Sequence, residues 1–359
     1  MKAAVCREFG KPLLIEEIDI AEPGPGEIKV KLAACAVCHS DIHYMEAAWG
    51  GDLPAVYGHE AAGVVETVGP GVAGLKPGDH VVVTLIRSCG HCHYCSQGLP
   101  VHCETKFSLD AKSPLRAKDG SPIVHGLYTA AFAEYAVVDV SQAVAIPADL
   151  PLDCAALLAC GVITGFGAVT NTANIPASAN VAVIGTGGVG LNSIQAAAIR
   201  GARTIVAVDL SDAKLAAARR FGATHDVNPS REDARKAIKA LTGGRGVDYA
   251  FVTVGAKVAI EQAFSYLAKA GSLVIVGTPA SDVITGFDPT TFASVGRKVL
   301  GSKMGSARLP VDMPLLVALY KQGRLKLDEL ISGRFPLERI NEAIAGVTSG
   351  EALRNVIVF

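Results

Sequence analysis

The stretch Val181-Ala182-Val183-Ile184-Gly185-Thr186-Gly187-Gly188-Val189-Gly190-Leu191 decides the fold of the second half of this chain. Four uncharged apolar residues lead into a G-x-G-x-x-G motif, and a helical run over 191–199 leads out of it. Glycines in this arrangement let the backbone approach a pyrophosphate at a helix N-terminus. The alternative is a glycine-rich turn in an ordinary α/β domain. The flanking strand and helix favour a dinucleotide site, contacted by Gly185, Gly187, Gly188, Val189 and Gly190.

An acidic residue stands where such a site needs one. Thr204–Val208 reads as the next strand, and Asp209 ends it, nineteen residues after Gly190. A carboxylate at this distance accepts hydrogen bonds from the adenosine ribose hydroxyls and repels a 2′-phosphate. The sequence therefore predicts NAD rather than NADP.

The second half alternates strands and helices. A helix is expected over Ser211–Phe221, with Ser211 as its N-cap and Gly222 at its end. This alternation predicts a parallel, doubly wound sheet, followed after about residue 303 by a helix around Pro314–Gln322 and a closing strand, Asn355–Phe359. The expected sheet strands are Val181–Ile184, Thr204–Val208, Ala223–Asp226, Tyr249–Thr253 and Ser272–Val276.

The first 150 residues have a different sequence pattern, in which short apolar runs are separated by turn signals such as Pro23-Gly24-Pro25-Gly26. This pattern is typical of an all-β, barrel-like domain. The expected strands are Ile28–Leu32, Ala61–Val68, His80–Leu85 and Ala133–Val138.

Length and composition fit two globular domains. The 359 residues are half hydrophobic, and 33 basic residues balance 34 acidic ones, which argues against a nucleic-acid or anionic-membrane partner. Residues 154–199 carry no charge, but Asn171, Asn174 and Pro176 interrupt them, so they read as buried core rather than a membrane span. No secretion signal is recognised, because Lys2, Arg7 and Glu8 break the N-terminal apolar stretch, and a cytoplasmic location is expected.

Four of the nine cysteines form a C-x2-C-x2-C-x7-C motif: Cys89, Cys92, Cys95 and Cys103. Four thiolates at this spacing can surround one tetrahedral zinc ion, with every coordination position filled by protein. An iron–sulfur cluster is the rival, but ferredoxin motifs close with three intervening residues and a following proline, whereas the last gap here is seven. The motif predicts a structural zinc site.

A second metal site is suggested by residues that lie farther apart. Cys38, His59 and Cys160 together would leave zinc a fourth, open position, as in catalytic sites. Isolated buried cysteines are also common as small core residues. Cys35 makes a C-x2-C pair with Cys38, so the residues alone leave the ligands ambiguous.

The segment Gly58-His59-Glu60-Ala61-Ala62-Gly63, followed after five residues by Gly69, resembles the signature of zinc-containing alcohol dehydrogenases of the medium-chain family. Cys38, the four-cysteine motif, Cys160, the glycine motif and Asp209 follow in that family's order over the whole chain. The resemblance implies a GroES-like β-barrel catalytic domain of residues 1–161 and 303–359, with a zinc lobe at 89–103. It also implies a Rossmann dinucleotide-binding domain of residues 162–302.

The resemblance also implies residue roles. Two zinc ions per chain are expected, one structural and one catalytic. Cys38, His59 and Cys160 would bind the catalytic zinc, Glu60 would approach it, and Asp41 would orient His59. Ser40 would contact the zinc-bound alcohol, and His43 would form the surface end of a proton relay. The remaining cofactor contacts would come from His39, Thr164, Lys214, Val254, Val276 and Arg354, with Thr164 on the nicotinamide, Lys214 on the adenosine ribose and Arg354 on the pyrophosphate.

The activity implied is that of an NAD-dependent zinc alcohol dehydrogenase, an enzyme that reversibly oxidises primary alcohols, including aromatic or allylic ones, to aldehydes. Its alcohol pocket would be lined by Trp49, Leu85, Leu127 and Thr278. One alternative is an S-(hydroxymethyl)glutathione (formaldehyde) dehydrogenase of the same family, and a remote one is a non-catalytic protein that binds NAD and zinc. The family also implies a homodimer or homotetramer, associated through sheet edges near residues 298–305.

Overall fold

The computed structural model describes residues 1–359, and the chain divides into two compact units. Unit 1 comprises Met1–Gly161, Arg308–Lys321 and Leu327–Phe359, and unit 2 comprises Val162–Ala307 and Gln322–Lys326. The chain leaves unit 1 after Gly161 and returns to it at Arg308.

Residues 303–307 belong to unit 2 because they pack on its first helix, α5 (Ile163–Gly167). A Cβ on Gly305 would stand 2.5 Å from the Ile163 carbonyl oxygen, so the two backbones are in direct contact. The Thr164 hydroxyl donates to Met304 Sδ at 3.7 Å, and Thr172 shares a 2.8 Å hydrogen bond with Ser306. These contacts hold residues 303–307 in unit 2.

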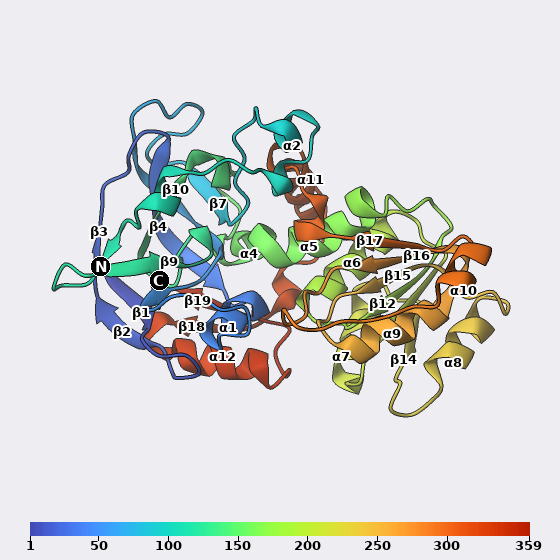
Figure 1. Ribbon diagram of the computed structural model, residues 1–359. Helices are drawn as coiled ribbons and strands as arrows, with labels where there is room; N and C mark the ends of the chain where they lie inside the picture. Colours follow the sequence, from blue (N-terminus) through green and yellow to red (C-terminus); the bar gives the residue numbers. More distant parts are fainter. The chain divides into compact units, whose positions relative to one another are not determined.

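Unit 2 is built on one parallel sheet of six strands in the order β14-β13-β12-β15-β16-β17 (Figure 1). Counted along the chain, this is the 3-2-1-4-5-6 order of a Rossmann fold. The strands are β12 (Asn180–Ile184), β13 (Thr204–Val208), β14 (His225–Val227), β15 (Val247–Val252), β16 (Leu267–Ile275) and β17 (Lys298–Gly301).

Helices α6, α7, α8 and α9 pack against this sheet. The predicted helix after Ser211 is α7: the Ser211 hydroxyl accepts from the Lys214 amide at 3.4 Å, and Gly222 follows its end at φ +112°. Positive φ is a conformation that glycine adopts without strain. The helices of unit 2 beyond α5 are α6 (Gly188–Ile199), α7 (Asp212–Arg220), α8 (Ala234–Leu241), α9 (Lys257–Tyr266) and α10 (Pro289–Ser294).

All five predicted strands of this unit exist, but three of them are displaced. The strand expected at Ala223–Asp226 begins two residues later, because the Ala223 amide still bonds Ala218 in the helix end. The strand expected at Ser272–Val276 begins five residues earlier, at Leu267, and the one expected at Tyr249–Thr253 begins at Val247.

Unit 1 contains two sheets, so the first 150 residues are mainly β as expected, although three short helices, α1 (His39–Met45), α2 (His93–Ser96) and α3 (Ser108–Ala111), interrupt the strands. The larger has the order β11-β7-β6-β4-β19-β18, with β10 also paired to β4; the smaller has the order β2-β1-β5-β9-β8-β3. The larger sheet contains β4 (Glu27–Ala36), β6 (Glu60–Val68), β7 (His80–Thr84), β10 (Tyr135–Asp139), β11 (Ala143–Ala145), β18 (Ile331–Pro336) and β19 (Arg354–Val358). The smaller contains β1 (Lys2–Cys6), β2 (Leu14–Glu17), β3 (Asp19–Ile20), β5 (Ala55–Val56), β8 (Leu115–Arg116) and β9 (Pro122–His125).

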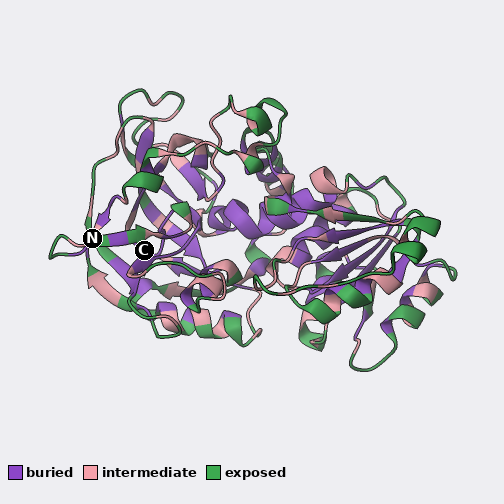
Figure 2. Cartoon of the chain, viewed as in Figure 1, coloured by how far each residue is buried: buried purple, intermediate pink, exposed green.

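Strand β19 joins the C-terminus to the N-terminal half, since its Val356–Val358 pair antiparallel with Ala34–Ala36 of β4. Figure 2 shows that the strands are largely buried while the outward faces of the helices are exposed. The helices of unit 1 are α1 (His39–Met45), α2 (His93–Ser96), α3 (Ser108–Ala111), α4 (Leu152–Leu157), α11 (Leu309–Lys321) and α12 (Ile340–Thr348).

One helical run, Leu152–Thr172, is long and apolar enough to cross a membrane by length and composition. Within its most apolar window 89% is buried in the protein, as in the core helices of soluble proteins. Length and composition alone are weak evidence for a span, and the burial agrees with the sequence-based interpretation of a core segment.

We expect Phe251→Ala to destabilise unit 2 by about 3–5 kcal/mol, because Phe251 is fully buried in β15 and its loss leaves a cavity. Denaturant unfolding measures this change. Val258→Ala is the control, since Val258 is 59% exposed and should change stability by less than about 0.5 kcal/mol. Equal effects of the two substitutions would contradict the placement of Phe251 in the core.

Candidate metal centres and nucleotide-binding site

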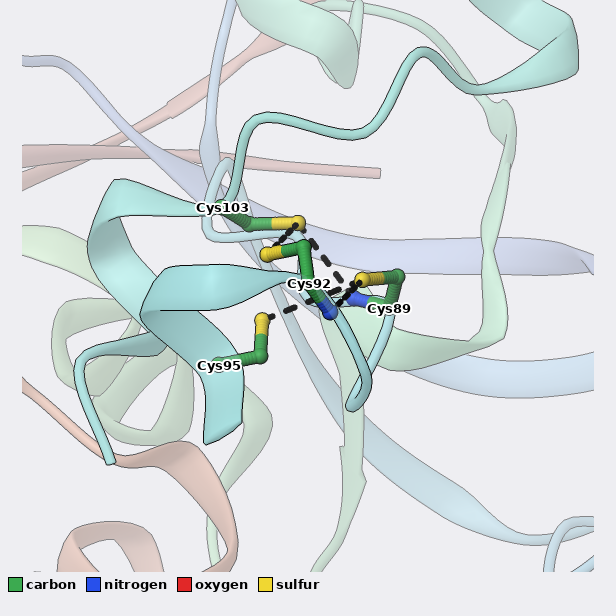
Figure 3. Close-up of side chains that lie close together, drawn as sticks. All are labelled: Cys89, Cys92, Cys95 and Cys103. Atoms are coloured by element: carbon green, nitrogen blue, oxygen red, sulfur yellow. Dashed lines mark hydrogen bonds between the residues drawn. The ribbon is translucent and has the colours of Figure 1, made fainter. Parts of the chain in front are cut away.

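The four cysteines of the predicted structural zinc lobe converge in unit 1 (Figure 3). Their sulfur atoms all lie within 4.8 Å of one another, and two measured pairs, Cys89–Cys95 and Cys92–Cys103, are 4.0 and 3.9 Å apart. Four sulfurs bound to zinc at ~2.3 Å in a tetrahedron stand about 3.8 Å apart. The lobe therefore fits a single tetrahedral ion, whereas an iron–sulfur cluster would hold the thiolates farther apart.

Hydrogen bonds from backbone amides favour the charged form of Cys89 and Cys92, whereas burial raises the pKa of Cys95 to about 12. The Cys92 amide donates to Cys89 Sγ at 3.2 Å, and the Cys89 amide donates to Cys103 Sγ at 3.4 Å. Hydrogen bonds from Thr105 and from backbone amides lower the pKa of Cys89 to about 5. Since the thiolate is the zinc ligand, the hydrogen bonds to Cys89 favour metal binding at that residue.

A second cluster in unit 1 consists of Cys38, His59, Glu60 and Cys160, all buried, with ligand atoms within 4.8 Å of one another. Cys38 is the N-cap of α1, His59 directly precedes β6, and Cys160 lies in the helical turn after α4. Cys35 is not a member of this cluster. Its thiol donates to the Ala36 carbonyl at 3.7 Å.

His59 is held in the orientation that a metal ligand needs. Its Nδ1 lies 2.9 Å from Asp41 Oδ1, while its Nε2 is buried and has no hydrogen-bond partner. A buried polar atom without a partner is costly, and a metal ion would satisfy it. The donor set of two thiols and an oriented imidazole fits zinc.

The buried charges of this cluster act on each other. The hydrogen bond from Cys160 holds the pKa of Cys38 well below its ordinary value, and Cys38 in turn raises that of Cys160. Although burial disfavours a charged imidazole, Asp41 and Cys38 raise the pKa of His59. A bound cation would replace the shared protons and leave thiolates with a neutral imidazole.

Glu60 is bound to an arginine rather than to solvent. Arg354 Nη2 donates to both carboxylate oxygens of Glu60, at 2.6 and 2.8 Å, and Nη1 donates to the Val37 carbonyl at 3.3 Å. Burial raises the pKa of Glu60, and the Arg354 charge opposes that shift. The family resemblance implies a pyrophosphate role for Arg354; in this structure it is a buried partner of Glu60, and the phosphate contact stays a prediction.

Gly161 makes room for this pair. A Cβ at Gly161 would stand 1.8 Å from Arg354 Nη2, so a side chain directly after Cys160 would displace the guanidinium. Sequence reasoning missed the Glu60–Arg354 pair, which joins residues 294 positions apart.

The expected proton-relay residues lie on α1, which begins with His39. Ser40 and His43 are three positions apart, so they share a helix face. The His43 ring centroid is 4.8 Å from that of Trp49, which places this predicted pocket residue beside the relay. Of the other predicted pocket residues, Leu85 and Leu127 are partly buried in unit 1, and Thr278 is exposed in unit 2.

In unit 2 the three glycines of the motif have distinct surroundings. Gly185 adopts φ +86°, and a Cβ on Gly190 would stand 1.9 Å from the Gly185 carbonyl oxygen. A Cβ on Gly187, in contrast, would meet nothing within 4 Å. Gly185 therefore makes a tight turn, Gly190 allows a close helix–strand contact, and Gly187 leaves an open approach for a pyrophosphate, as in a dinucleotide fingerprint.

Asp209 is tied to this loop. Its Oδ2 accepts from the Thr186 amide at 2.7 Å and from the Thr186 hydroxyl at 3.1 Å, and its Oδ1 accepts from the Ser211 amide at 2.9 Å. The carboxylate thus stands at the N-terminus of α7, next to the glycine turn. The other predicted cofactor residues of this unit differ in exposure: Thr164 and Val276 are buried, and Lys214 and Val254 are half-buried.

Comparisons with known proteins agree with this geometry. Residues 24–148 match the family model described as alcohol dehydrogenase GroES-like domain, and residues 188–322 match that of zinc-binding dehydrogenase. The chain is 36% identical to alcohol dehydrogenase 1 of Pisum sativum over 99% of its own length and 96% of the pea protein. The chain belongs to the zinc-containing alcohol dehydrogenase family of medium-chain dehydrogenases, a class of zinc- and nicotinamide-dependent oxidoreductases.

Two solved structures are similar over their whole length. An alcohol dehydrogenase zinc-binding domain protein from Burkholderia ambifaria has a TM-score of 0.95 at 37% identity and covers 100% of this chain and 98% of its own. Benzyl alcohol dehydrogenase from Acinetobacter calcoaceticus has a TM-score of 0.93 at 31% identity, with 100% and 99% coverage. The predicted fold class, a GroES-like barrel domain with a Rossmann domain, is confirmed.

We expect Cys92→Ser to reduce bound zinc from two ions per chain to one and to lower stability by more than about 4 kcal/mol, because the lobe has no apolar core of its own. Metal analysis and denaturant unfolding measure both changes. Cys154→Ser, outside both clusters, is the control and should keep two ions. Full stability with one zinc ion lost would contradict a structural role.

We expect Asp41→Ala to weaken zinc binding at the Cys38–His59–Cys160 cluster about 10–100-fold, because His59 loses the carboxylate that orients it. Asp41→Asn should weaken zinc binding less than Asp41→Ala does, since its amide oxygen still accepts from His59. The rate of zinc loss to a chelator measures the effect, with Asp119→Asn, in an exposed turn, as the control. An unchanged rate in Asp41→Ala would refute the positioning role.

Proposed function

We propose that this protein is an NAD-dependent zinc alcohol dehydrogenase that interconverts primary alcohols and aldehydes. The observation that carries the proposal is the cluster of Cys38, His59 and Cys160, in which a buried imidazole nitrogen without a partner faces two thiols. The Rossmann unit with its open Gly187 supplies the other requirement, a dinucleotide site.

Two zinc ions per chain are proposed, one for each cluster. The four-cysteine lobe would be coordinatively saturated by protein, so its role would be structural. At the second cluster three side chains would bind the ion and Arg354 would hold Glu60, which leaves a position for the substrate oxygen. A zinc ion there lowers the pKa of a bound hydroxyl and stabilises alkoxide charge.

Side chains of the protein would then carry the alcohol proton to solvent. The Ser40 hydroxyl would accept it from the alcohol oxygen, and His43, on the same face of α1, would pass it to solvent. Thr164 would position the nicotinamide, and Asp209, fixed by Thr186 and Ser211, would accept from the adenosine ribose hydroxyls. The carboxylate at this position is the reason for choosing NAD over NADP.

The proposed substrates are primary alcohols, including flat aromatic ones. Trp49 packs beside His43 and against Tyr44 at 5.4 Å, so an aromatic wall stands next to the proton relay. The similarity to a benzyl alcohol dehydrogenase supports this class. Formaldehyde dehydrogenase activity is not favoured, because no basic residue is identified that would hold a glutathione carboxylate.

A homodimer or homotetramer in the cytoplasm is proposed as well. Strand β17 is the last strand of its sheet, and Lys298 and Val299 are exposed. A sheet edge leaves backbone groups unpaired, and pairing with the same edge of a second copy would satisfy them.

The decisive experiment follows nicotinamide absorbance with the zinc-loaded protein, NAD or NADP, and ethanol, hexanol, benzyl alcohol, cinnamyl alcohol and S-hydroxymethylglutathione. We expect primary alcohols to be oxidised, with NAD preferred about tenfold or more in kcat/KM. Activity with the glutathione adduct alone would support the formaldehyde branch instead. No activity with any substrate, when two zinc ions per chain are bound, would refute the proposal.

A further inference from the structure

The turn that carries Leu127 has an unusual backbone. Leu127, Tyr128 and Ala130 adopt φ of +50°, +60° and +51°, although none of them is glycine. Such left-handed conformations are disfavoured for residues with a Cβ and persist only where neighbouring contacts impose them. The turn, residues 126–130, is therefore held from outside.

Part of this support comes from the segments that carry metal ligands. The Ala131 amide donates to the Gly58 carbonyl at 2.9 Å, one residue before His59. The buried Gln142 amide donates to the carbonyls of Tyr128 and Thr84 at 2.9 and 2.8 Å, and the Thr84 hydroxyl donates to Ala159, one residue before Cys160. The turn is thus connected to the backbone on both sides of the cluster.

The outer side of the turn is held by one arginine. The Arg87 guanidinium carbon lies 3.9 Å from the centre of the Tyr128 ring and 4.5 Å from the centre of the Phe107 ring, so it is in contact with both aromatic side chains. Arg87 Nη1 lies 2.7 Å from Asp110 Oδ1, and the Arg87 side chain is only 10% exposed. Desolvated cation–π contacts and a shielded ion pair are stronger than their exposed counterparts.

The partners of Arg87 belong to the zinc lobe. Phe107 is the N-cap of α3, a few residues after Cys103, and Asp110 is the third residue of this helix. The Phe107 amide donates to Asp110 Oδ2 at 2.9 Å. Arg87 itself precedes Cys89 by two residues. The guanidinium is thus bound on one side to the segment leaving the four-cysteine lobe and on the other to the strained turn.

We infer that Arg87 is a positioning residue that fastens the zinc lobe to the turn of residues 126–130, so that this lobe determines where Leu127 stands in the alcohol pocket. The inference rests on the proposed function, in which Leu127 contacts the alcohol side chain. A displaced Leu127 changes the fit of a bulky alcohol more than that of a small one, because only the bulky alcohol reaches the pocket wall.

The test compares Arg87→Met and Arg87→Lys with wild-type zinc-loaded protein. Met keeps the length without the charge, and Lys keeps the charge without the planar group that contacts the rings. We expect the ratio of KM for benzyl alcohol to KM for ethanol to rise about tenfold in Arg87→Met and less in Arg87→Lys. Arg339→Met is the matched control, since Arg339 lies over Phe335 at 5.6 Å and pairs with Glu342, outside the turn. Its ratio should stay at the wild-type value.

Hydrogen exchange of the peptide covering residues 126–132 gives a readout that does not depend on activity. We expect faster exchange in Arg87→Met and in Cys92→Ser than in wild type or Arg339→Met. Unchanged exchange and an unchanged KM ratio in Arg87→Met would overturn the inference, as would an equal loss of activity on both alcohols. If wild-type protein oxidises neither alcohol, the proposed function fails, while the exchange arm still decides whether Arg87 holds the turn.

Discussion

The carboxylate of Asp41 is the contact on which the arrangement of the second metal cluster depends. Its Oδ2 accepts from the Cys38 amide at 3.1 Å, and its Oδ1 accepts from the Gly58 amide and faces His59 Nδ1, both at 2.9 Å. One buried side chain therefore fixes the start of α1, the approach to β6 and the ring orientation of His59. Because zinc ligands must be held close to their bound geometry, this shared acceptor gives the cluster its form before a metal ion binds.

The same region balances its buried charges in two separate groups. Two thiolates from Cys38 and Cys160 would neutralise one Zn²⁺, and Arg354 neutralises Glu60 through two short contacts. An unpaired buried charge costs several kcal/mol, so each group needs its own partner. This separation explains how a carboxylate can lie within 4.8 Å of three candidate metal ligands while its oxygens are directed to an arginine.

Whether a feature could be predicted from the sequence depends on how far apart along the chain its interacting residues lie. The glycine loop and the four-cysteine lobe are local motifs, and their spacing was enough to predict their surroundings. Cys38, His59 and Cys160 are far apart, and only the resemblance to a family brought them together. The Glu60–Arg354 pair and the Gln142 contacts could not be recognised in the sequence, because neither residue type nor periodicity reveals a partner that is distant along the chain. The observed start of a strand differs from the predicted one where the preceding helix end extends into it, as at Ala223.

Two glycines show how tightly the proposed metal ligands His59 and Cys160 are enclosed. Gly58 precedes His59 at φ +93°, and a Cβ there would stand 2.6 Å from the Phe132 amide nitrogen. Gly161 follows Cys160, and a Cβ there would overlap Arg354. In both places the backbone beside a ligand packs directly on another segment, so the ligand cannot shift without moving that neighbour. Phe132 follows the strained turn of residues 126–130 by two positions, and Arg354 is the partner of Glu60. The glycines thus couple the ligands to the two features of the site that lie beyond direct metal contact: the wall of the pocket and the charge that restrains Glu60.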